Sequence, residues 1–142
     1  MKLFLVILSV ILNLNGCKDS NIIQEAISIE YSAISRGTYK NIIINKKEIS
    51  FQKNRASKAL VKPCSEENWT SIYNTLKTID IPNIPNLKAP SDKRMYDAAA
   101  IAKLKITYQD SIYESQSFDH GNPPQEIAEL VKEILSITEN IE

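Results

Sequence analysis

Glycine is scarce in this chain, with three residues in 142. Loops that cradle phosphate groups need several glycines at close spacing, because the backbone must approach the ligand closely. No such loop is present, and neither the nucleophile motif GxSxG nor the metal motif HExxH occurs. The sequence therefore contains no nucleotide-binding loop and no recognisable hydrolase nucleophile.

Histidine and cysteine are equally rare, with one His (His120) and two Cys (Cys17 and Cys64). A structural zinc site takes four ligands, drawn mainly from these two residue types. The chain alone cannot supply such a set, and we expect neither a metal nor another cofactor.

Long apolar runs are limited to residues 3–12, which follow Met1-Lys2 and are interrupted only by Ser9. Ten residues of helix rise about 15 Å, half of a bilayer core of roughly 30 Å. The run is too short for a stable membrane span. It has the length of the apolar region of a secretory signal.

The sequence Leu14-Asn15-Gly16-Cys17 at the end of this run resembles the lipobox of small bacterial lipoproteins. The resemblance implies cleavage before Cys17, lipidation of its sulfur and acylation of the new amino terminus. Two or more acyl chains make a membrane anchor effectively permanent. Lys18 after the cysteine is similar to the sorting pattern for the outer membrane, so the resemblance implies an outer-membrane envelope protein. An ordinary signal peptide and an uncleaved anchor are the alternatives.

These features divide the chain into a signal peptide (residues 1–16), the lipidated Cys17 with a polar tether (17–25) and one domain (26–142). Cleavage leaves 126 of the 142 residues, with 16 basic and 17 acidic side chains. That length suits a single domain. A net charge of −1 excludes bulk attraction to nucleic acid, and Cys64 has no disulfide partner if Cys17 is lipidated.

Alternating apolar residues predict strands in the first half of the domain. The clearest strand has Ile27, Ile29, Tyr31 and Ala33 on one face, and others are predicted over residues 39–44 and 49–51. Residues 52–62 are basic and weakly patterned, which predicts an exposed edge or loop.

Ser65 is a predicted helix cap, followed by Glu66, Glu67 and apolar residues at helical spacing up to Ile79. Pro82 and Pro85 predict an extended connection over residues 80–92. The longest strand is predicted over 98–108, a hairpin at residues 109–111, another strand over 112–118 and a final helix after Pro124.

The predicted order is therefore ββ(β)-α-ββ-α. Connections of hairpin length favour antiparallel pairing. Two amphipathic helices must bury their apolar stripes, and one face of the sheet is the nearest apolar surface. The sequence predicts an α+β fold, with an antiparallel sheet of about four to five strands and two amphipathic helices packed on one face.

Three places have residues suited to a site. The loop Asp119-His120-Gly121-Asn122 offers a histidine base that Asp119 would orient; alternatively, Asp119 or Asn122 caps the last helix and the histidine packs locally. Arg36 and Asp97 form either a site or a structural ion pair. Ile84 and Leu87, within residues 81–90, either contact a partner or cover a sheet edge.

Four features in succession resemble the emfourin family, which are small bacterial inhibitors of thermolysin-like metalloproteases. They are the turn Ser35-Arg36-Gly37-Thr38, the helix over 69–79, Tyr96 before the long strand, and a closing helix with the pattern P…I..LV..I. The run LKAPSDKRMYDAAAIAKLKI…SFDHGNPPQEI is more similar to a group of uncharacterised small bacterial lipoproteins. The first resemblance implies a metalloprotease partner, and the second implies only a location.

Two functional hypotheses follow. The first is a membrane-anchored binding or inhibitor module for an envelope or secreted protein. The second is a small envelope hydrolase or lyase that uses Asp119 and His120. The first is favoured, because the sequence offers only one histidine and no activated nucleophile.

Overall fold

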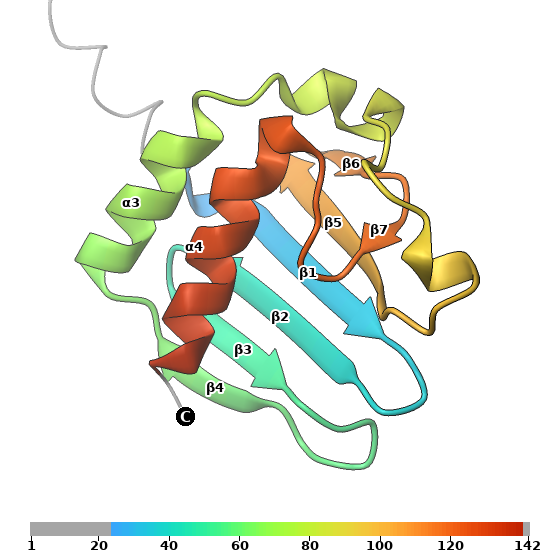
Figure 1. Cartoon of the computed structure of the whole chain (residues 1–142). Helices are drawn as coiled ribbons and strands as arrows, with labels where there is room; N and C mark the ends of the chain where they lie inside the picture. The colour runs from blue at the N-terminus through green and yellow to red at the C-terminus, as the bar shows by residue number, and fades with distance from the viewer. Residues whose placement is uncertain (1–23, 141–142) are drawn as a thin grey trace, which may run out of the picture.

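The computed structural model describes residues 24–140 (Figure 1). The predicted signal peptide, the lipidation site Cys17 and the tether up to residue 23 lie outside the described residues. Near the start of the described residues, the side-chain oxygen of Gln24 accepts a hydrogen bond from the Trp69 indole at 3.3 Å. Within residues 24–140, no helix has the length and apolar character needed to cross a membrane.

Strand β1 (Ser28–Ile34) is the central strand of the sheet. It pairs along its whole length with β2 (Tyr39–Asn45) on one side and β5 (Ile101–Tyr108) on the other. The sheet continues outward through β3 (Glu48–Gln52) to β4 (Leu60–Pro63), and beyond β5 to β6 (Ser111–Glu114). A short strand β7 (Phe118–Asp119) also pairs with β5, and every pairing is antiparallel.

Helices α3 (Glu66–Leu76) and α4 (Ala128–Glu139) lie on the same face of this sheet (Figure 1). Ser65 caps α3 as predicted, since its hydroxyl accepts the Asn68 N–H at 3.1 Å. A short 3-10 helix, η4 (Gln125–Ile127), leads into α4. The predicted α+β class, with an antiparallel sheet and two helices on one face, is confirmed.

The core lies between this sheet face and the two helices. Alternate strand residues point into it, because successive side chains of a strand leave on opposite faces. Its fully buried members include Ile29, Tyr31, Ile42, Ile44, Leu104 and Ile106 from the strands and Ile72, Leu130 and Ile134 from the helices. The opposite face of the sheet is polar in its middle, where Glu30 pairs with Lys105 and Lys103 with Glu114.

The structure differs from the predicted strands in two places, at β4 and at β6–β7. The residues predicted as an exposed edge or loop end in β4, whose four residues are all exposed at the edge of the sheet. The strand predicted over 112–118 is split into β6 and β7 by Ser115. This buried residue exchanges two hydrogen bonds with the Leu104 backbone, at 2.8 and 3.0 Å.

The prediction of an extended connection over residues 80–92 is wrong. The chain forms the 3-10 helix η2 (Ile81–Asn86), and η3 (Lys93–Met95) follows shortly after. Pro82 fits the start of η2, and apolar residues three positions apart share one face of a 3-10 helix. Ile81, Ile84 and Leu87 therefore point into the core, and η2 packs beside β6.

Ile84 is fully buried and Leu87 nearly so, which excludes both from contact with a partner. We expect Ile84→Ala to lower the free energy of unfolding by about 2–5 kcal/mol, since it removes buried methyl groups and leaves a cavity. Ile112→Ala is the matched control, because this side chain is 67% exposed; its effect should stay within about 0.5 kcal/mol. Urea unfolding measures both. Equal stability of the two variants would contradict the burial of η2.

Candidate functional site

Asp119 is buried and anchors the η3 turn to β7. Its carboxylate accepts hydrogen bonds from the Ser91 hydroxyl (2.5 Å) and from the backbone N–H groups of Lys93 and Arg94 (2.8 Å each). The Arg94 guanidinium adds a salt bridge at 3.2 Å. Burial by itself raises the pKa of Asp119, but the hydrogen bonds from Ser91, Arg94 and Lys93 outweigh it and lower the pKa to about 2.

His120 faces the other way, toward β1. Its Nδ1 lies 2.7 Å from the hydroxyl of the buried Tyr31. Burial raises the pKa of Tyr31, so the phenol stays protonated in this hydrogen bond. Burial, followed by the charge of Lys40, lowers the pKa of His120, which keeps the imidazole neutral at pH 7.

Asp119 and His120 therefore do not work as a pair. Within residues 24–140, the Asp119 carboxylate forms hydrogen bonds with Ser91, Lys93 and Arg94, whereas the Nδ1 atom of His120 forms one with Tyr31. Neither Asp119 nor Asn122 caps α4; Asn122 instead donates to the Ser91 hydroxyl at 2.7 Å. The geometry matches the local-packing interpretation of this loop and gives no support to an Asp–His catalytic centre.

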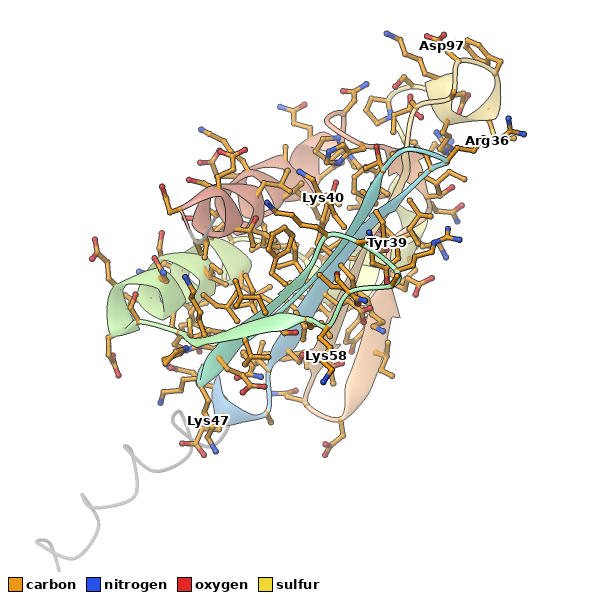
Figure 2. The ribbon with its side chains drawn as sticks, turned by 90° about the horizontal axis from the view of Figure 1, so that it is seen from below. Arg36, Tyr39, Lys40, Lys47, Lys58 and Asp97 are labelled. Carbon is orange, nitrogen blue, oxygen red and sulfur yellow. The ribbon has the colours of Figure 1, made fainter. Side chains whose placement is uncertain are left out.

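Arg36 and Asp97 also remain separate. Both are exposed, and no ion pair joins them in the described part of the chain. Arg36 lies in the turn between β1 and β2, whereas Asp97 lies between η3 and β5 (Figure 2).

The free thiol of Cys64 is half-buried just before α3. Burial raises its pKa, which keeps it protonated and unreactive near neutral pH. Among residues 24–140, no three His, Cys, Asp or Glu side chains lie close enough together to hold a metal ion.

The most unusual surface runs along β2, β3 and β4 and the turns that join them. Residues 36–62 contain eight basic residues and one acidic residue, Glu48, in a chain with 17 of each. The basic residues are Arg36, Lys40, Lys46, Lys47, Lys53, Arg55, Lys58 and Lys62. By contrast, α3 and α4 together contain five glutamates and one lysine. We call residues 36–62 the basic edge, and Figure 2 views the molecule from this side.

An open depression of about 610 Å³ lies at one end of the basic edge. It combines positive charge with exposed apolar side chains, and none of its described lining residues is acidic. Its main lining residues are Ile34, Arg36, Tyr39, Lys53, Arg55 and Ile101. The Arg55 guanidinium lies 5.8 Å from the centre of the Tyr39 ring, on the side of the sheet that the helices leave uncovered.

The β3–β4 loop that carries Arg55 and Lys58 is held in a defined shape. The Gln52 amide donates to the carbonyls of Asn54 (3.0 Å) and Ser57 (2.7 Å), and the Asn54 side chain accepts the Ala56 N–H at 3.0 Å. A preorganised loop loses little conformational entropy on binding.

Arg36 is thus the one predicted site residue that lies in this depression. Sequence reasoning described residues 52–62 as basic but gave them no function, because it judged partners from the charge of the whole domain, where the two signs nearly cancel. The local run of cations between Arg36 and Lys62 was the signal that could have identified the surface.

The hydrogen bonds to Asp119 predict how stability depends on pH. Its folded pKa of about 2 lies below the unfolded value of about 3.9, so this stabilisation is present above pH 4 and is lost as pH falls toward 2. Asp119→Asn should have a lower melting temperature than the wild type at pH 6, and the gap should shrink toward pH 2. Thermal unfolding between pH 2 and 6 measures this, with exposed Asp97→Asn as the control. A gap that is constant with pH would contradict the assignment.

Comparison with protein-family models, with curated proteins and with solved structures gives no match for this chain.

Proposed function

We propose that this protein is a lipoprotein anchored through Cys17 in the bacterial envelope, in the outer membrane, and that its domain is a binding or inhibitor module. Its partner is an envelope or secreted protein with an acidic surface. The observation that carries the proposal is the segregation of charge, with eight basic residues and one acidic residue between Arg36 and Lys62.

The position of the tether supports this role. The chain enters the described domain at Gln24, and β1 then runs seven residues from Ser28 to Ile34. At about 3.3 Å per residue, this strand places the Arg36 turn more than 20 Å from its start. An anchor at Cys17 would leave the depression at the end of the sheet farthest from the point where the tether joins the domain.

The composition of the surface favours a protein partner. Its exposed apolar residues Ile34 and Ile101 lie beside the cations, a combination that suits a protein surface with acidic and apolar parts. Single-stranded nucleic acid instead needs a series of aromatic side chains on which bases stack. Among the described residues that line the depression, Tyr39 alone is aromatic. Secreted metalloproteases, implied by the emfourin resemblance, are the first partners to test.

Site-specific crosslinking in cells tests the proposal. A photoreactive amino acid in place of Arg55 should give an adduct with a discrete partner, whereas the same residue in place of the exposed Lys88 should not. Adding Arg36→Glu should reduce the Arg55 adduct at least about fivefold, because a repelled acidic partner dissociates faster.

The anchor is tested in the same cells. Cys17→Ala should move the protein out of the membrane fraction, and the wild-type protein should have the intact mass of a chain that begins at Cys17 with added acyl groups. Adducts of equal yield from positions 55 and 88 would contradict the binding surface. An unmodified wild-type chain would contradict the anchor.

A further inference from the structure

Strand β4 is the outer strand of the basic edge, and one of its sides is unpaired. It pairs with β3 through Leu60–Phe51 to Pro63–Glu48, and no strand among residues 24–140 lies on its other side. An edge strand of this kind presents backbone donors and acceptors to solvent, and an extended peptide can add to it as a further strand.

The register shows which backbone groups point outward. The Cys64 N–H donates to the Lys47 carbonyl at 3.0 Å, so residues 64 and 47 stand at a position of the β3–β4 ladder where backbone groups point toward the partner strand. Hydrogen-bonded pairs recur at every second position of an antiparallel ladder. Lys62 and Leu60 therefore direct their backbone groups toward β3, while the N–H and C=O of Val61 point away from the sheet. Pro63 offers only its carbonyl.

The side chains of β4 divide between the two faces of the sheet. Leu60 and Lys62 lie on the helix-covered face, because they pair with Phe51 and Ile49; Val61 lies on the open face opposite Ser50. Leu60 is 47% and Val61 is 53% exposed. Lys58, two residues before Leu60, is also exposed at this edge (Figure 2). An added strand would meet Leu60 and Lys62 on the helix-covered face and Val61 on the open face.

The positive charge of this edge favours binding of a negatively charged strand. Residues 49–65 contain four basic residues and no acidic one. Lysine and proline on an edge strand oppose pairing with a like strand, so two copies of this edge would repel each other. An acidic strand would be attracted instead.

We propose that the partner's contact element is an extended acidic segment, which adds to β4 as a further strand and forms hydrogen bonds with the backbone of Val61. This inference rests on the proposed binding function and specifies the chemistry and conformation of the partner.

Peptide binding to the full chain in detergent tests strand addition. The probe is a fluorescein-labelled Ser-Glu-Val-Glu-Val-Glu-Ser peptide with a blocked carboxyl end, and anisotropy reports its Kd. Two further peptides are N-methylated either at the three glutamates or at the two valines. N–H groups of alternate residues point to the same edge of a strand, so one methylated peptide should bind at least tenfold more weakly and the other within about twofold of the parent.

Protein variants locate the site. Val61→Pro removes the outward N–H while leaving the bonds to β3 in place, and it should weaken binding at least tenfold. Lys58→Glu should weaken binding at least about fivefold, and Lys88→Glu, an exposed lysine outside the basic edge, should leave the Kd unchanged. The methylated peptides need no protein variant, so they decide the question even if Val61→Pro fails to fold.

Three results would overturn the inference. The first is equal binding of the two methylated peptides. The second is equal binding of a peptide with lysine in place of each glutamate. The third is a dimer in sedimentation that becomes monomeric with Val61→Pro, since this would mean that a second copy of the chain occupies the edge. If position 55 gives a crosslinked adduct but N-methylation of the peptide does not change its Kd, the proposed binding function is supported and strand addition is rejected.

Discussion

Burial of one sheet face beneath α3 and α4 is the constraint on which the rest of this structure depends. The central strand β1 turns Ile29, Tyr31 and Ala33 toward the helices along its whole paired length. A one-residue slip would reverse every side chain, so the alternation fixes the register of the neighbouring strands. Because both helices lie on the same side, the opposite face and the β4 edge are exposed within the described residues.

Charge is distributed unevenly over this arrangement. The helices contribute mostly glutamate, and eight basic residues lie between Arg36 and Lys62, along β2, β3 and β4 and the turns that join them. The two ion pairs in the middle of the open face, Glu30–Lys105 and Lys103–Glu114, neutralise the β1–β5–β6 side. Between Arg36 and Lys62, the stretch that forms the β2–β4 side, Glu48 is the one acidic residue. A chain without net charge can therefore present a surface of one sign, which attracts an oppositely charged partner over roughly a Debye length of 8 Å.

The sequence predicts well those elements whose pattern is local. The alternation in β1, the Ser65 cap and the stripe of α4 each follow from neighbouring residues, and all three form as expected. Residues 80–92 are predicted as extended from Pro82 and Pro85 alone. The three-residue spacing of Ile81, Ile84 and Leu87, which indicates a 3-10 helix, did not enter that prediction. The role of Asp119 depends on hydrogen bonds from Ser91, Lys93 and Arg94, which lie more than twenty residues earlier in the chain. Local sequence patterns do not predict contacts between residues so far apart.

Candidate sites are harder to predict for the same reason. A polar cluster such as Asp119-His120 looks alike in sequence whether it binds a ligand or holds a turn, and only the distances to Ser91 and Tyr31 distinguish the two. A surface built from β2, β3 and β4 depends on which strand ends at the edge, which follows from the whole sheet order. The local charge run could have been read from the sequence. Its exposure on an unpaired strand could not.

Native-state amide hydrogen exchange, followed residue by residue on the full chain, tests the central claim that β4 has a free edge. We expect the amides of Leu60 and Lys62 to be protected through their bonds to β3 by at least about 100-fold. The amide of Val61, between them, should exchange at nearly the rate of an unstructured chain. Equal protection of all three amides would contradict a free edge at β4, since it would mean that the outer side of this strand is already covered.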